Sequence, residues 1–196
     1  MDKRLKIWEL SLLIALCFSL CVGTWAEARH RSISDSLLRL HVIAVSDDAI
    51  EQQIKMNVRD AVLDYMTPRL ETASDVLEAG QIIQGELHGI KAAAEKVSCG
   101  RAVSVTLSEE YYPTREYDSF SLPAGRYRSL RVILGEGEGH NWWCVIFPPL
   151  CVSAAEQQDA LDAMSDDVRG LVTEADGYQV KFRIVELWDK LIEYLK

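Results

Sequence analysis

Proline and glycine are scarce in this chain: it has 5 and 11 of them among 196 residues, against a hydrophobic content of 48%. This composition excludes a collagen-like or intrinsically disordered chain, because the apolar residues suffice to bury a core. The length suits one domain with appendages. Basic residues are also few: 21 Lys and Arg face 30 Asp and Glu, for a formal net charge of -9. Because phosphate neutralisation needs a basic patch, nucleic acid is a disfavoured partner.

Metal and cofactor motifs are missing from the sequence. It contains no C-x-x-C or H-E-x-x-H spacing, and its four histidines are scattered. Glycines alternate with glutamates over residues 135–139, but the spacing is not G-x-G-x-x-G and the carboxylates would repel a phosphate. We interpret this segment as a turn between strands, with positive φ at one or more glycines. We therefore expect no metal and no cofactor.

The N-terminus has the layout of a targeting segment. Three cations occur among the first six residues, an uncharged run covers residues 10–22, and small residues follow. A helix of thirteen residues spans about 20 Å, which is short of the roughly 30 Å hydrocarbon core of a membrane. We therefore predict a secretory signal peptide that is cleaved after Ala26 or Ala28. An uncleaved membrane anchor is the alternative.

Hydrophobic periodicity predicts an α+β fold for the rest of the chain. Apolar or alternating runs indicate strands, and apolar residues at spacings of three and four indicate helices. In chain order, we predict a strand at 37–45, helices at 50–65 and about 73–97, strands at 102–107, 127–134 and 143–147, and a C-terminal amphipathic helix at 180–195. Strands grouped after helices favour a mixed, mostly antiparallel sheet of about four strands, with the two long helices packed on one face.

Several residues mark the expected ends of these elements. Asp48 and Glu51 have the spacing of a capping box at the start of the first long helix. Pro68 is expected to stop or kink that helix, and Cys99, followed by glycine, to end the second. Residues 111–125 are interpreted as a long connection with aromatic anchors.

The cysteines of the core predict a disulfide. Cys144 and Cys151 enclose a Pro-Pro turn, which lets the chain double back and bring the two sulfurs together. In an exported protein we favour a bond between them, which leaves Cys99 unpaired; the alternative is two small buried hydrophobes. His140 and Cys144 could instead be a catalytic base and thiol, but catalysis also needs an orienting group and an oxyanion donor. Because an exported thiol beside a second cysteine tends to be oxidised, we expect no enzyme.

Two adjacent tryptophans mark a candidate binding segment. Trp143 begins a predicted strand and Trp142 directly precedes it, so alternation along the strand should point their side chains to opposite faces. Tryptophan is enriched at interface hot spots, and one ring could anchor the core while the other contacts a partner. His41, flanked by apolar residues in the first predicted strand, is interpreted as a hydrogen-bonded core histidine.

The sequence resembles the family of stage II sporulation protein R. The similarity spans about residues 37–152, and residues 182–190 also match. The blocks that carry it are Leu40-His41-Val42-Ile43-Ala44, Val58-Arg59-Asp60-Ala61-Val62, Tyr112-Pro113-Thr114-Arg115, Leu122-Pro123-Ala124-Gly125 and, above all, His140-Asn141-Trp142-Trp143-Cys144 with Phe147-Pro148-Pro149-Leu150-Cys151.

This resemblance implies a secreted signalling protein of endospore-forming bacteria. Family members are exported from the forespore into the space between the two membranes that separate it from the mother cell. There they activate a membrane-embedded aspartic protease, which removes the pro-sequence of sigma-E. The resemblance implies a ligand rather than an enzyme.

These observations divide the chain into four parts. In order, they are a signal peptide or anchor at 1–28, a polar spacer at 29–36, a core α+β signalling domain at 37–152, and an acidic segment with the C-terminal amphipathic helix at 153–196. The residues expected to contact the protease are His140, Asn141, Trp142, Trp143, Tyr112 and Arg115. A secreted Cys-His hydrolase that acts on cell-wall or peptide substrates is the alternative function.

Overall fold

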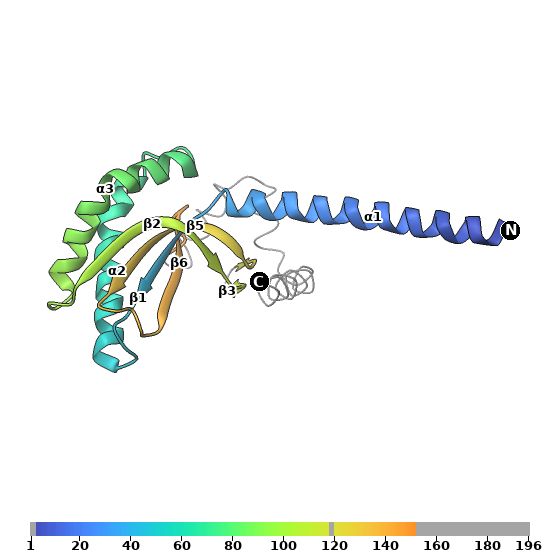
Figure 1. Ribbon diagram of the computed structural model, residues 1–196. Helices are drawn as coiled ribbons and strands as arrows, with labels where there is room; N and C mark the ends of the chain where they lie inside the picture. The colour runs from blue at the N-terminus through green and yellow to red at the C-terminus, as the bar shows by residue number, and fades with distance from the viewer. Residues whose placement is uncertain (1–2, 118–119, 152–196) are drawn as a thin grey trace.

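The computed structural model describes residues 3–117 and 120–151 of the chain (Figure 1). The acidic segment and the amphipathic helix predicted after Val152 lie outside these residues. The described elements are, in order, α1 (Lys3–Ser34), β1 (Leu38–Ile43), α2 (Ala49–Leu70), α3 (Val76–Val97), β2 (Val103–Tyr112), β3 (Arg115–Glu116), β4 (Ser121–Leu122), β5 (Gly125–Leu134) and β6 (Asn141–Phe147).

Four strands form the main sheet in the order β2-β5-β1-β6. β1 is parallel to β5 and antiparallel to β6, and β2 is antiparallel to β5. The predicted α+β fold is confirmed, with a mixed, mostly antiparallel sheet and two long helices on one face. β3 and β4 form a separate small hairpin.

α2 and α3 cover one face of the sheet, which we call the helix face (Figure 1). The apolar stripe of each helix meets the side chains of alternate strand residues, and this packing makes the main core. Its central members are Ile54, Val58, Val62 and Met66 from α2, Ile83 and Ile90 from α3, and Leu40, Val42, Leu130 and Val132 from the strands. Because β1 lies in the middle of the sheet, all of its residues are buried.

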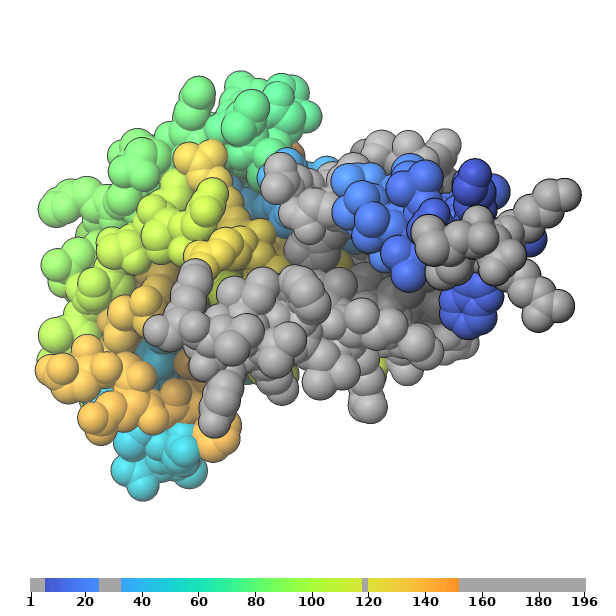
Figure 2. Space-filling model, turned by 45° about the vertical axis from the view of Figure 1, so that its right-hand side comes forward, coloured from blue at the N-terminus to red at the C-terminus, as the bar shows by residue number. Residues whose placement is uncertain are grey.

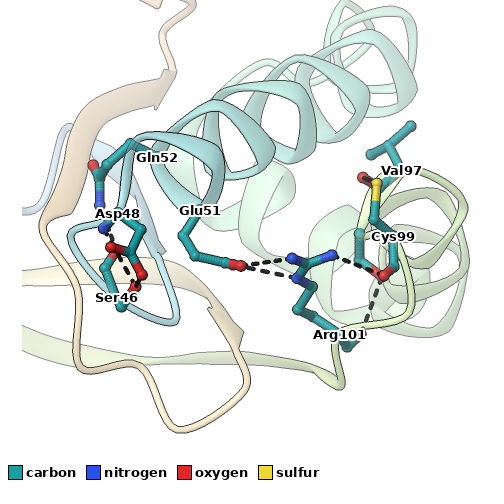
Figure 3. A network of polar contacts seen from close by, with 8 residues as sticks. Ser46, Asp48, Glu51, Gln52, Val97, Cys99 and Arg101 are labelled. Atoms are coloured by element: carbon teal, nitrogen blue, oxygen red, sulfur yellow. Dashed lines mark hydrogen bonds and ion pairs between the residues drawn. The ribbon is translucent and has the colours of Figure 1, made fainter.

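The contacts that stabilise the start of α2 differ from those predicted from the sequence. Asp48 is the N-cap residue but makes no side-chain cap hydrogen bond, so the predicted capping box is wrong. The Glu51 carboxylate instead accepts hydrogen bonds from Arg101 Nη2 at 2.6 Å and Nε at 3.3 Å (Figure 3). Two charge-assisted hydrogen bonds from one arginine are stronger than the single hydrogen bond that a backbone N–H would donate to this carboxylate. It also ties the first turn of α2 to the turn after α3.

Reciprocal capping occurs at the other long helix. Asp75 accepts a hydrogen bond from the backbone N–H of Glu78 at 2.8 Å. The Glu78 side chain reaches back to the N–H of Ser74, also at 2.8 Å. α3 therefore begins at Val76, slightly later than the predicted position of about 73.

Other boundaries also differ from the predicted ones. α2 continues past Pro68 to Leu70, which is buried in the core; the proline lies in the last turn, where it removes one helical hydrogen bond. β2 extends to Tyr112, because its second half pairs with the start of β5. The connection predicted at 111–125 is accordingly shorter and contains the β3–β4 hairpin.

The predicted glycine turn between β5 and β6 is confirmed. Gly135 has φ of 56° and Gly137 has φ of 70°, in the left-handed region. A Cβ on Gly137 would also lie 2.7 Å from Ile133 Cγ2, so a side chain has no room there. α3 ends as expected, with Cys99 at φ 52° and Gly100 at φ 83°.

α1 is one long helix that extends away from the sheet (Figure 1). Residues 29–34, predicted as a polar spacer, continue this helix. Its segment Lys6–Thr24 has the length and composition to cross a membrane, and its apolar side chains are exposed. This helix is compatible with a signal peptide or with a retained anchor. Near its end, Ile33 is buried against the body of the domain.

Candidate functional site

The face of the sheet opposite α2 and α3, here called the second face, carries buried polar groups. Because side chains alternate along a strand, Leu40 of β1 faces the helices while Arg39 and His41 point to the second face. Arg39 is fully buried and His41 is only 4% exposed. A small apolar cluster surrounds this face, with Ile33, Leu37, Tyr112, Phe120, Leu122, Tyr127, Val145 and Leu150 as its buried members.

Arg39 lies among aromatic rings. Its guanidinium carbon is 4.0 Å from the ring centroid of Tyr112 and 5.1 Å from that of Tyr127. Arg39 Nη2 donates a hydrogen bond to Tyr117 Oη at 2.6 Å. Nε and Nη1 have no hydrogen-bond partner among the described residues. Cation–π contacts therefore supply most of the compensation for the buried charge.

His41 is a hydrogen-bonded core histidine, as the sequence predicts. Its Nδ1 lies 2.9 Å from a carboxylate oxygen of Glu110. Its ring centroid is 5.5 Å from that of Trp143 and 6.1 Å from that of Tyr112. Arg131 Nε lies 3.6 Å from the same carboxylate. The second face thus combines two cationic side chains, a histidine–carboxylate pair and aromatic rings.

Two tyrosines form the buried base of the second face. Tyr112 Oη and Ser129 Oγ are 2.6 Å apart, and Tyr127 Oη donates to the carbonyl of Pro123 at 2.7 Å. Burial raises the pKa of both phenols, so they remain neutral hydrogen-bonding groups. Tyr112, one of the residues expected to contact the protease, is only 1% exposed. Its ring supports neighbouring side chains from below.

Arg115 and Trp143 lie together above this base. The guanidinium carbon of Arg115 is 3.8 Å from the ring centroid of Trp143. Arg115 is exposed and Trp143 is half-buried. The centroid of Trp143 is 5.9 Å from that of Tyr112. Three of the six expected contact residues, from β2, β3 and β6, are therefore gathered on the second face.

The other three expected residues lie apart from that group. Trp142 points to the helix face, where Arg59 of α2 stacks on it at 4.5 Å. His140 is exposed at the turn before β6, and Asn141, the first residue of β6, is also exposed. In the space-filling view this turn, in orange, lies next to the cyan start of α2 (Figure 2). The tryptophans thus point to opposite faces, as alternation predicts.

The turn before β6 is held to α2 by polar contacts. Asp47 binds His140 twice: its carboxylate pairs with the ring Nδ1 and accepts the backbone N–H at 2.6 Å. These hydrogen bonds hold the pKa of Asp47 below its ordinary value. Lys55 Nζ donates to the His140 carbonyl at 3.0 Å, and burial lowers the pKa of this lysine. The contacts give His140 a structural role at the turn.

The structure contains the disulfide that the sequence favours. Cys144 and Cys151 are bonded, with their Cα atoms 5.7 Å apart. Cys144 is buried beside Leu40, its partner on β1. In this state Cys144 has no free thiol to act as a nucleophile. Cys99 carries a free, exposed thiol.

Sequence reasoning missed Arg39, Glu110 and Tyr117. One signal was present, because Arg39 and His41 alternate with Leu38 and Leu40 in a strand expected to be fully buried. Such alternation indicates a second buried surface with its own chemistry. No sequence signal brings Tyr117 to Arg39, which is 78 positions away in the chain.

Comparison with known proteins identifies the family. The family described as Stage II sporulation protein R (spore_II_R) matches residues 34–157. The chain is 34% identical over 180 residues to "Stage II sporulation protein R" of Bacillus subtilis (strain 168), a match that covers 79% of this chain and 80% of that protein. No solved structure matches the chain. The family match begins where α1 ends and includes the whole sheet. The chain belongs to the stage II sporulation protein R family.

Proposed function

We propose that this protein is an exported sporulation signal that activates a membrane-embedded aspartic protease and so triggers pro-sigma-E processing in the mother cell. Family membership gives the chain a role in sporulation. The protease and its substrate come from what the family resemblance implies. An N-terminal helix able to enter a membrane and an acidic body are consistent with export into the space between the two membranes.

The observation that carries the proposal is the pairing of Arg115 with Trp143 on the second face. Arginine and tryptophan are enriched among the few residues that dominate binding energies. Here their geometry is set by the buried tyrosines and by Arg39 beneath them. A surface of this kind loses little side-chain entropy when a partner binds, because it is already ordered.

The disulfide supports a ligand over the alternative Cys-His hydrolase. A thiol enzyme needs a free thiolate within reach of its base. Cys144 is bonded to Cys151, and the ring of His140 is paired with Asp47. A ligand needs only the shape that these contacts maintain.

The test is reconstitution of processing in cells that do not sporulate. The protease and pro-sigma-E would be produced together, with and without the exported full chain, and the loss of the pro-sequence followed by immunoblot. We expect cleavage only when the chain is present. Cleavage that is independent of the chain would contradict the proposal. So would a hydrolytic activity of the purified chain that Cys144→Ser abolishes while the fold survives.

Trp143→Ala tests the second face in the same assay. We expect it to abolish processing, because it removes the ring on which Arg115 stacks. Trp142→Ala is the matched control: the same residue type is deleted one position earlier, on the helix face. Secretion and the far-UV circular dichroism spectrum would establish that both variants fold. Full activation by Trp143→Ala would show that this surface does not contact the protease.

A further inference from the structure

The second face carries a surplus of positive charge, although the chain as a whole is acidic. Among the described residues, the strands present three arginines to this face, Arg39, Arg115 and Arg131, and one carboxylate, that of Glu110. The whole chain has 21 Lys and Arg against 30 Asp and Glu. A local surplus of the opposite sign favours an anion at this surface.

The carboxylate of Glu110 is already engaged by its neighbours. His41 Nδ1 lies 2.9 Å from one of its oxygens and 3.0 Å from the other, and Arg131 Nε lies 3.6 Å from the carboxylate. Arg39 and Arg115 pair with no carboxylate in the part of the chain that the structure describes. The positive surplus therefore comes from these two guanidinium groups.

Arg115 is held in an orientation that suits a planar anion. Its guanidinium carbon lies 3.8 Å from the ring centroid of Trp143. The N–H donors of a guanidinium lie at the edges of its plane, where a ring beneath the plane cannot accept them. Glu116, the next residue of β3, points to the other side of the hairpin by alternation. The edge of Arg115 can therefore donate paired hydrogen bonds to a carboxylate that approaches from outside.

Arg39 adds a second positive charge beneath this pair. Its guanidinium carbon is 4.0 Å from the ring centroid of Tyr112, which is 5.9 Å from that of Trp143. Partial burial and, to a smaller extent, the charge of Arg39 lower the pKa of Arg115. Because Arg39 is buried, water and salt screen its charge little. An anion bound to Arg115 would offset the repulsion between the two arginines.

We propose that Arg115, stacked on Trp143, binds the carboxylate of an aspartate or glutamate that the protease exposes to the space between the two membranes. The edge of the guanidinium would donate two hydrogen bonds to that carboxylate, and Trp143 would hold the arginine in place. The identity of the partner rests on the proposed function. The chemistry of the contact rests on the charges of the second face.

A protein carboxylate fits this surface better than the head group of an anionic lipid. The chain has a formal net charge of -9, so an anionic membrane surface would repel the body as a whole. A single acidic side chain brings one negative charge to the arginines without that wider repulsion. Its planar group with two oxygens also matches the edge of a guanidinium.

Substitutions of Arg115 test the contact in the processing assay. The amount of full chain is varied by inducer and measured by immunoblot. We expect Arg115→Glu to raise the amount needed for half-maximal processing about 10-fold or more, because two like charges would then meet. Arg115→Lys should have a smaller effect, since lysine keeps the charge but lacks the planar edge.

Arg126→Glu is the matched control for Arg115→Glu. It makes the same charge change at an exposed position of β5, where alternation points the side chain away from Tyr127 and the second face. We expect it to leave processing unchanged. Secretion and the far-UV circular dichroism spectrum would establish that the variants fold.

An exchange of charges between the two proteins then identifies the carboxylate. Each aspartate and glutamate that the protease exposes on the side of this chain would be changed to arginine in turn. We expect one such protease variant to respond poorly to the unaltered chain and better to Arg115→Glu, because opposite charges face each other again. Arg126→Glu should not restore its processing. A purely structural role of Arg115 would give no such reciprocal restoration.

The outcomes separate this inference from the proposed function. If the unaltered chain does not activate the protease, the proposed function fails and this inference fails with it. If the unaltered chain activates and Arg115→Glu activates as well as Arg126→Glu, this inference fails alone. If Arg115→Glu is impaired and no charge reversal in the protease restores processing, the carboxylate is not on the protease, and this inference is overturned. Restoration by one reversal would identify the acidic residue that Arg115 binds.

Discussion

The two faces of the sheet are built from the same strands but use different physics. On β1, Leu40 belongs to an aliphatic core under α2 and α3, whereas Arg39 lies among aromatic rings on the second face. Both side chains are fully buried. Burial of Leu40 removes apolar surface from water, which stabilises the fold. Burial of Arg39 also removes the hydration of a charge, which costs free energy. The comparison teaches that equal burial on one strand does not mean equal contribution to stability.

The free energies of burial of Leu40 and Arg39 differ accordingly. Complete burial of a leucine contributes about 1.5–3 kcal/mol. Burial of a charged group costs several kcal/mol, which only good compensating contacts offset. Arg39 has cation–π contacts and one hydrogen bond to a neutral hydroxyl, and no carboxylate pairs with it among the described residues. We infer that the helix face supplies most of the stability, while the second face fixes the geometry of the surface above it.

The largest expected effect is that of Leu40→Ala on the helix face. This substitution leaves a cavity in the centre of the sheet, beneath both helices. It should lower the free energy of unfolding by about 2–5 kcal/mol. The measurement is urea unfolding of the full chain in nanodiscs, followed by far-UV circular dichroism. A loss much smaller than this would mean that the helix face is not the main source of stability.

Removal of the disulfide should have the next largest effect. The bond spans a sequence separation of 7, and the loop-entropy relation gives about 2.5 kcal/mol for a loop of this length. The variant with both Cys144→Ala and Cys151→Ala should show this loss of unfolding free energy. Addition of a reductant to the unaltered chain should produce a similar loss, and addition to the double variant should produce none. A reductant effect that persists in the double variant would point to another disulfide.

Arg39→Met is the sharpest test of the comparison. It replaces a buried cation by an apolar side chain of similar length and leaves the surrounding rings in place. We expect the free energy of unfolding to change by less than about 1 kcal/mol, or to increase, because the cost of desolvating the charge is removed. Processing should nevertheless fall, since the base beneath Arg115 and Trp143 changes. A destabilisation as large as that of Leu40→Ala would mean that the second face contributes as much to stability as the helix face.

The helix face could be predicted from the sequence, because local periodicity encodes it. The stripes of α2 and α3 and the alternation at Val103 and Val105 give the elements and the buried side of each. The disulfide could also be predicted from the sequence, since the Pro-Pro turn brings Cys144 and Cys151 back together. These features depend on residues that are near in sequence or follow a regular period.

The second face could be predicted only in part. Alternation places the two tryptophans on opposite faces, but nothing in the sequence says that Tyr112 is buried or that Arg115 stacks on Trp143. The prediction of a capping box was wrong for a related reason. The Glu51 side chain binds Arg101, which is 50 positions away, and so does not cap its own helix. Contacts between distant side chains depend on the assembled sheet and leave no periodic signal.

The smallest expected effect concerns the exposed histidine pair at the turn before β6. Asp47 and His140 form a carboxylate–histidine pair like that of Glu110 and His41, but their side chains are 57% and 77% exposed, against 21% and 6% for the buried pair. Water screens such a pair, so Asp47→Asn should destabilise the fold much less than Leu40→Ala or loss of the disulfide.

The pH dependence of that loss identifies its origin. Hydrogen bonds from His140 lower the pKa of Asp47 in the folded state. The contribution of the carboxylate is therefore present above its ordinary pKa of 3.8 and is lost as the pH falls through the lower folded value. The difference in unfolding free energy between the unaltered chain and Asp47→Asn should thus be seen near neutral pH and vanish in strong acid. Asp64→Asn, an exposed site on α2, is the control. A difference in unfolding free energy that persists in strong acid would show that the charge of Asp47 does not hold the turn. Packing of its side chain would then hold the turn, as uncharged packing holds the helix face.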